Sequence, residues 1–66
     1  MKLHVNGEWK TVNSELTLKQ LLEKFQINAG NVVVEHNEVV ISRPELESTT
    51  LREGDKVEIV QFVGGG

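Results

Sequence analysis

The last residues of this 66-residue chain carry its most distinctive chemical group, the α-carboxylate of Gly66. Gly64, Gly65 and Gly66 directly follow a β-branched and aromatic run that begins at Val57 and has the composition of a strand. Glycine has no Cβ, so its backbone reaches positive φ freely and can pass close to other atoms. A terminal carboxylate, with an ordinary pKa of about 3.3–3.7, is ionised at neutral pH and acylates only after activation. We therefore predict a flexible tail that presents Gly66 for covalent chemistry, in preference to a frayed end or the remnant of a tag.

Length and composition restrict the classes of protein that could carry such a tail. A chain of 66 residues predicts one domain, with little room for both a core and an enclosed active site. It has no cysteine, which excludes a disulfide framework, a thiolate metal site and a persulfide on this chain. The net charge of −3 disfavours nucleic acid and favours partners with basic surfaces. Without a signal peptide or long apolar run, we expect a cytoplasmic carrier, monomeric when free, with no membrane partner.

The first twelve residues predict a β-hairpin. Asn6-Gly7 is the strongest short turn signal and is typical of a type I′ turn. A two-residue loop pairs Val5 with Glu8 and puts Trp9 on the outer face. A slip of one residue would send Trp9 inward, and the sequence leaves both arrangements open.

Two stretches predict helices by their capping residues. Thr17 and Gln20 form a capping box, and apolar residues then recur at helical spacing. This main helix is expected to pack on the strands through one stripe of apolar side chains, which consists of Leu18, Leu21, Leu22 and Phe25. Ser42 and Glu45 repeat the capping-box spacing around a proline, which predicts a short second helix to about Glu47.

The remaining segments predict further strands. Residues 32–35 form a continuous apolar run, as expected for a strand buried in the middle of a sheet, and residues 39–41 form a shorter one. Two strands, a helix, two strands, a short helix and a last strand predict an α+β fold with one main helix on one face of a mixed sheet of four to five strands. In the β-grasp arrangement, the first and last strands pair in parallel at the centre. We expect a β-grasp domain over residues 1–63 and a glycine tail over 64–66.

Alternation along the last strand predicts a binding surface beside the tail. Val57 and Ile59 are assigned to the core, which leaves Glu58, Val60 and Phe62 on the open face of the sheet. Exposed apolar side chains next to a functional tail usually mark a protein interface. We predict a partner interface at Glu58, Val60, Phe62 and Val63. The alternative for Phe62 is ordinary packing over the sheet edge.

The other polar residues have ordinary explanations. His4 and His36 lack a paired nucleophile in the sequence and are interpreted as surface histidines. The later carboxylates match no calcium loop, so no metal site is predicted. Glu53 and Asp55, which precede the last strand, are expected to face basic groups of a partner together with Glu58.

Several segments together resemble a known family. They are Leu3-His4-Val5-Asn6-Gly7, the Thr17–Leu22 helix start, Val40-Ile41-Ser42-Arg43, Glu53-Gly54-Asp55, Val57-Glu58-Ile59-Val60 and Val63-Gly64-Gly65-Gly66. In this order, over nearly the whole chain, they resemble the ubiquitin-like sulfur carriers of thiamine biosynthesis. The chain departs from the usual family pattern at Ser42, Leu46 and Gly64.

The resemblance implies a mechanism for the tail. A ubiquitin-activating-like adenylyltransferase would adenylate the Gly66 carboxylate with ATP and magnesium, which the carrier itself does not bind. A sulfur donor such as a cysteine desulfurase would displace AMP to leave a thiocarboxylate, and thiazole synthase would take the sulfur. The resemblance thus implies a protein cosubstrate and not an enzyme. Two alternatives stay open: a molybdopterin-synthase-type small subunit with the same tail chemistry, and a non-covalent ubiquitin-like interaction domain.

Overall fold

The computed structural model describes residues 1–13 and 15–61 of the chain. Within these residues the elements, in chain order, are β1 (Lys2–Val5), β2 (Glu8–Thr11), α1 (Leu18–Lys24), the short 3₁₀ helix η1 (Ala29–Asn31), β3 (Val32–His36), β4 (Val39–Ile41), α2 (Arg43–Ser48) and β5 (Lys56–Gln61). No helix in this part of the chain is long and apolar enough to cross a membrane.

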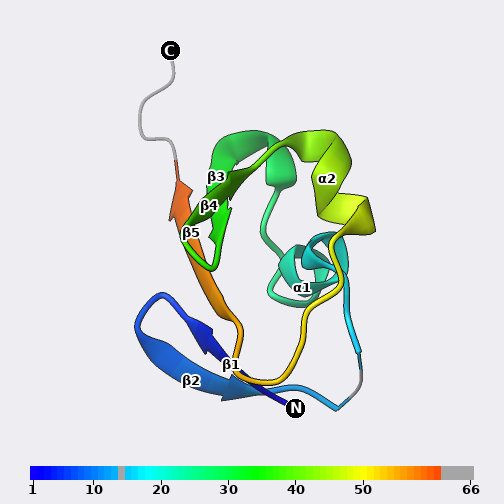
Figure 1. Ribbon diagram of the computed structural model, residues 1–66. Coiled ribbons are helices and arrows are strands. Elements are labelled where there is room, and N and C mark those ends of the chain that lie inside the picture. The colour runs from blue at the N-terminus through cyan, green and yellow to red at the C-terminus, as the bar shows by residue number, and fades with distance from the viewer. Residues whose placement is uncertain (14, 62–66) are drawn as a thin grey trace.

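The five strands form one mixed sheet in the order β2-β1-β5-β3-β4. β1 and β5 run parallel at its centre, and the other neighbours are antiparallel. Both α-helices lie on the same side of the sheet (Figure 1). The predicted α+β architecture is therefore confirmed as a ubiquitin-like β-grasp, with five strands, one main helix and a short second helix.

The first hairpin forms in the expected register. Asn6 and Gly7 have φ values of 48° and 84°, as a type I′ turn requires, and Val5 lies opposite Glu8. Trp9 is 63% exposed, which resolves the ambiguity left by the sequence in favour of the outer face. Its ring lies tilted against that of His4, with a centroid separation of 4.9 Å.

The helices begin where their caps predict. Thr17 Oγ1 accepts the Gln20 backbone N–H at 3.2 Å, and Gln20 Oε1 accepts the Thr17 N–H at 2.9 Å. At the start of α2, Glu45 Oε1 accepts both the Ser42 backbone N–H at 3.0 Å and the Ser42 hydroxyl at 2.7 Å. The helices and the inner face of the sheet enclose one core of buried apolar side chains: Leu3, Val5, Val12, Leu18, Leu21, Leu22, Val34, Leu46, Leu51, Val57 and Ile59.

The prediction of a fully buried run at residues 32–35 is wrong in one respect. β3 does lie inside the sheet, between β5 and β4. However, the helices cover only one face of the sheet (Figure 1). Successive side chains of a strand alternate between its two faces, so only every second residue of β3 can face the core. Val34 is buried and Val32 packs against the core partly buried, whereas Val33, on the other face, is half-buried.

Candidate functional site

β5 is the strand that leads toward the glycines, and it occupies the centre of the sheet (Figure 1). Buried and exposed side chains alternate along β5 as predicted, because Val57 and Ile59 enter the core while Val60 stays exposed. The described chain ends at Gln61. The predicted interface residues Phe62 and Val63, the tail residues Gly64, Gly65 and Gly66, and the expected domain boundary after residue 63 all lie outside the described residues.

The open face of β5 continues onto its neighbours as a mixed surface. Val60 lies opposite Val33, and Glu58 lies opposite Glu35, across the β5–β3 pair. Val40 of β4 pairs with Glu35 on the far side of β3 and is exposed. We call these five residues the open-face patch. The sequence identified its β5 members, but Val33, Glu35 and Val40 could be added only once the strand order and register were known.

The centre of the open-face patch is acidic. Glu35 and Glu58 are directly opposed on antiparallel strands, a position in which like charges repel. The nearest cation partner of Glu58 is Lys56, whose Nζ lies 3.9 Å from the carboxylate, at the limit of an ion pair. A basic side chain from a partner would therefore meet two carboxylates flanked by exposed valines.

Asp55 does not belong to this surface, contrary to the prediction. Its carboxylate is 15% exposed and accepts hydrogen bonds from His36 Nε2 at 2.8 Å and from the Arg52 backbone N–H at 2.9 Å. Glu53 is likewise engaged locally, because its Oε1 accepts the Lys2 backbone N–H at 3.0 Å. Both precede β5, at the end of the strand away from the glycines. The interpretation of His36 as a plain surface histidine is corrected by the same contact.

These contacts set the protonation of Asp55. Burial disfavours its charged form and acts to raise the pKa of Asp55. The hydrogen bonds from His36, the Arg52 N–H and Asn37, together with the charge of His36, act in the opposite direction and prevail, so the pKa of Asp55 is lowered from its ordinary value. Asp55 is therefore an ionised structural group that ties the loop before β5 to the end of β3.

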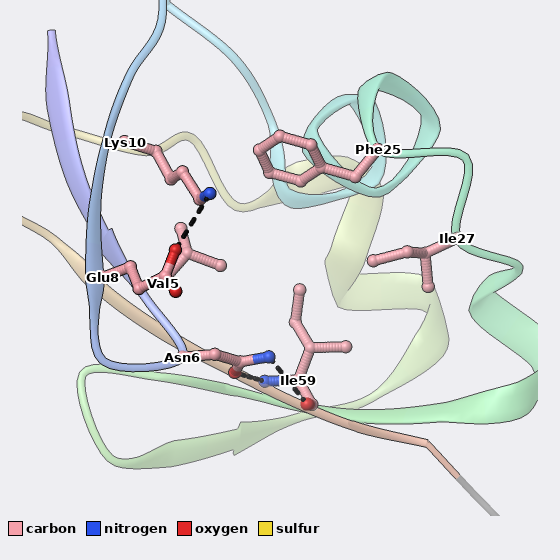
Figure 2. Close-up of a pocket in the computed structure, with 7 residues that line it drawn as sticks. All are labelled: Val5, Asn6, Glu8, Lys10, Phe25, Ile27 and Ile59. Atoms are coloured by element: carbon pink, nitrogen blue, oxygen red, sulfur yellow. Dashed lines mark hydrogen bonds and ion pairs between the residues drawn. The ribbon is translucent and has the colours of Figure 1, made fainter.

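A shallow hollow of about 310 Å³ lies between the first hairpin and α1 (Figure 2). Ile59 forms part of its wall, two residues before the described chain ends. The charged groups in it are Glu8 and Lys10, which form an ion pair at 3.2 Å. Its lining residues are Val5, Asn6, Glu8, Lys10, Phe25, Ile27 and Ile59.

Asn6 is a residue of this site whose side-chain role the sequence did not reveal. Its Oδ1 accepts the backbone N–H of Ile59 at 2.7 Å, and its Nδ2 donates to the carbonyl of Ile59 at 3.2 Å (Figure 2). The Asn-Gly signal predicted the turn but not this contact with a residue 53 positions later. In the described part of the chain, no group of three or more acidic or histidine side chains could hold a metal ion.

These features define a class of protein. The fold is a ubiquitin-like β-grasp, and its central strand precedes the terminal glycines in the sequence and presents an acidic and apolar open face. The described residues offer small surface hollows and a histidine that is hydrogen-bonded to Asp55, but no assembled catalytic set. The described residues therefore place the chain in the class of small ubiquitin-like β-grasp proteins.

Comparisons with known proteins agree with this class. A family model described as the ThiS family matches residues 3–66, and the chain belongs to that family. The sulfur carrier protein ThiS of Bacillus subtilis is 36% identical over 67 aligned positions, which cover 97% of this chain and 98% of that protein. The crystal structure of the thiamine biosynthesis protein ThiS from Geobacter metallireducens superposes with a TM-score of 0.87 at 39% identity and covers 100% of both chains.

A longer relative also matches. A thiazole synthase of Paramagnetospirillum magneticum is 35% identical over 66 residues, which are the whole of this chain but 20% of that protein. The chain thus spans about a fifth of that relative's length. The resemblance drawn from the sequence, to the sulfur carriers of thiamine biosynthesis, is confirmed at the level of the family. None of these relatives supports the molybdopterin alternative.

Proposed function

We propose that the chain carries sulfur as a thiocarboxylate on Gly66 and delivers it for thiazole formation in thiamine biosynthesis. The observation that carries this proposal is that the family match extends through Gly66 and so includes the glycines as well as the fold. The central position of β5 supports it further, because the strand that precedes the glycines pairs with another strand on each side. The proposal requires Gly66 to be the last residue of the functional protein.

The proposed chemistry has two steps on this chain. The Gly66 carboxylate attacks the α-phosphorus of ATP, which forms an acyl-adenylate and releases pyrophosphate. A sulfide sulfur then attacks the acyl carbon and AMP leaves, which gives the thiocarboxylate. If the sulfur arrives as a persulfide, the product is an acyl disulfide, and a thiol must cleave its S–S bond. Magnesium, which neutralises phosphate charge, and the alignment of the reacting groups are contributed by the activating enzyme.

Three partners follow from this chemistry. A ubiquitin-activating-like adenylyltransferase would bind the ATP and magnesium, and a donor such as a cysteine desulfurase would supply the sulfur. Thiazole synthase would accept it, and the presence of a region similar to this chain within a thiazole synthase supports that pairing. These proteins would meet the carrier in the cytoplasm, and the free carrier would be a monomer.

We propose that the activating enzyme docks on the open-face patch next to the tail. The interface predicted from the sequence, Glu58, Val60, Phe62 and Val63, would form its part nearest the glycines. Exposed valines supply apolar contact, and the opposed carboxylates of Glu35 and Glu58 favour a basic counterpart. Complementary charge of this kind mainly speeds encounter and fixes orientation.

Mass spectrometry of the intact protein tests the proposal. The purified chain is incubated with its candidate adenylyltransferase, ATP, magnesium and sulfide, and its mass is compared with that of a sample lacking ATP. We expect a gain equal to the replacement of one oxygen by sulfur, located on Gly66 by fragmentation. A chain that binds the enzyme but never gains this mass would instead be a non-covalent interaction domain.

A further inference from the structure

The contact between Asn6 and Ile59 lengthens the central pairing of the sheet by one step. The end of β1 pairs through its backbone with the start of β5 only, where His4 lies beside Lys56 and Val5 beside Val57. The Asn6 backbone N–H still reaches the Val57 carbonyl at 3.0 Å, after which the chain turns away into the hairpin loop. A carboxamide offers the same donor and acceptor as a peptide group. The Asn6 side chain therefore supplies Ile59 with the partner that β1 no longer provides.

Beyond Ile59, β5 has a neighbour on one side only among the described residues. Val60 and Gln61 still pair with β3, opposite Val33 and Val32. On the β1 side, the last fixed point of the strand is the pair of hydrogen bonds from Asn6. This point lies seven residues before Gly66, a length of chain that spans at most about 24 Å when extended. Without the Asn6 hydrogen bonds, the end of β5 would be held along its β3 edge alone, so the direction in which the chain continues from Gln61 would be less restricted.

A second asparagine holds the opposite end of the same strand. Asn37 Oδ1 accepts the Lys56 backbone N–H at 2.9 Å, and the Asn37 N–H donates to the Lys56 carbonyl at 2.8 Å. Asn37 is also a turn residue with positive φ, at 50° against 48° for Asn6. Both residues therefore have a left-handed φ and a side-chain oxygen that accepts a backbone N–H of β5, although Asn37 Nδ2 also donates to Asp55 Oδ1 at 3.3 Å. They differ in that one lies at the end toward the glycines and the other at the start.

We propose that Asn6 is a positioning residue for the chemistry at Gly66. By holding Ile59, its carboxamide fixes the direction in which the chain continues from β5, and this lowers the entropic cost of aligning the carboxylate with ATP on the activating enzyme. The inference rests on the proposed function, because it assigns a role in that reaction. Asn37 secures the fold without influencing the tail.

Paired glycine variants test this assignment. Glycine tolerates the positive φ of both positions, so Asn6→Gly and Asn37→Gly each keep the turn and lose the side-chain hydrogen bonds. Both are expected to melt at lower temperature by similar amounts. In ATP-dependent pyrophosphate release with the activating enzyme, Asn6→Gly should lower kcat about tenfold, the effect of losing one or two hydrogen bonds. Its KM should change little, and Asn37→Gly should keep both constants near those of the parent.

A conservative variant and an exchange measurement complete the test. Asn6→Asp keeps the acceptor for the Ile59 N–H but loses the donor, so it should recover part of kcat, and it replaces Asn6→Gly if that variant does not fold. Amide hydrogen exchange should show loss of protection at Ile59 in Asn6→Gly and at Lys56 in Asn37→Gly. Equal kcat values for the two folded glycine variants, or for Asn6→Asp and the parent, would overturn the positioning role. A parent chain that is not adenylated would instead overturn the proposed function itself.

Discussion

Asp55 shows at the scale of one residue how a carboxylate can serve the fold instead of a partner. It lies just before β5 and accepts hydrogen bonds from His36, Asn37 and the Arg52 backbone N–H. The sequence could not reveal this, because His36 and Asp55 are 19 positions apart and meet only when β3 and β5 pair. Because the spacing of His36 and Asp55 matches no known motif, the sequence suggested that both are free surface groups.

The lowered pKa of Asp55 predicts how stability depends on pH. Because the folded pKa lies below the ordinary value of 3.8, the stabilisation is complete above that value and is lost as the pH falls through the folded pKa. The parent should therefore lose stability progressively as the pH is lowered from about 5 to about 2. Asp55→Asn should be less stable at pH 7 by about 1–2 kcal/mol and should lose less on acidification. Thermal unfolding followed by circular dichroism over this pH range measures both, and parallel curves for the two proteins would contradict the assignment.

Val60 and Val39 form a matched pair for testing the docking surface. They are 59% and 60% exposed, but only Val60 belongs to the open-face patch, whereas Val39 pairs with His36 near the opposite end of β5. Val60→Ser should raise the KM for the carrier in the adenylation assay several-fold, because apolar contact is lost on docking. Val39→Ser should leave KM unchanged, and both should alter the free energy of unfolding by less than about 0.5 kcal/mol. Equal KM values for the two variants would place the docking surface elsewhere.

At the scale of elements, the sequence predicted the turns, the helix starts and part of the strand pairing, but not the register of β3 against β5. The Asn6-Gly7 turn and the capping boxes at Thr17 and Ser42 predicted the first hairpin and the starts of both α-helices, because the residues responsible are within four positions of one another. The parallel pairing of β1 with β5 followed from the expected β-grasp arrangement. The open-face patch also depends on the register of β3 against β5, which no local signal specifies.

The negative charge of Glu58 and Glu35 on the open face of the sheet predicts an electrostatic contribution to partner association. Replacing Glu58 by lysine reverses the charge next to Glu35 at the centre of the open-face patch. The association rate with the activating enzyme should fall at low ionic strength, and the deficit should shrink as salt shortens the Debye length from about 30 Å at 0.01 M to about 10 Å at 0.1 M. Stopped-flow binding across this range measures it.

Glu23→Lys is the control for that measurement, because it makes the same change of net charge on the exposed surface of α1, on the helical side of the sheet. We expect a much smaller effect on the association rate from this variant. If both variants slow association equally, net charge alone is responsible and Glu58 has no specific part in docking.

For the whole molecule, the core and the proposed chemistry occupy separate parts of the chain. All buried apolar residues of the described core lie between Leu3 and Ile59. Deleting Gly66 should therefore change the free energy of unfolding by less than about 0.5 kcal/mol while abolishing adenylation. Denaturant unfolding and pyrophosphate release measure the two quantities on the same sample. Adenylation at the parent rate without Gly66 would rule out the carrier proposal.

The central place of β5 has a consequence for how the protein is made. In the strand order β2-β1-β5-β3-β4, β5 alone joins the first hairpin to the pair formed by β3 and β4, and it is the last of these strands to be synthesised. A nascent chain that stops before Lys56 has two separate strand pairs and cannot close its sheet, and an isolated two-stranded hairpin is at best marginally stable in water. Folding therefore waits for the segment that leads to the glycines. A ribosome that terminates early releases a chain open to proteolysis, and not a folded decoy that could occupy the activating enzyme without the glycine tail.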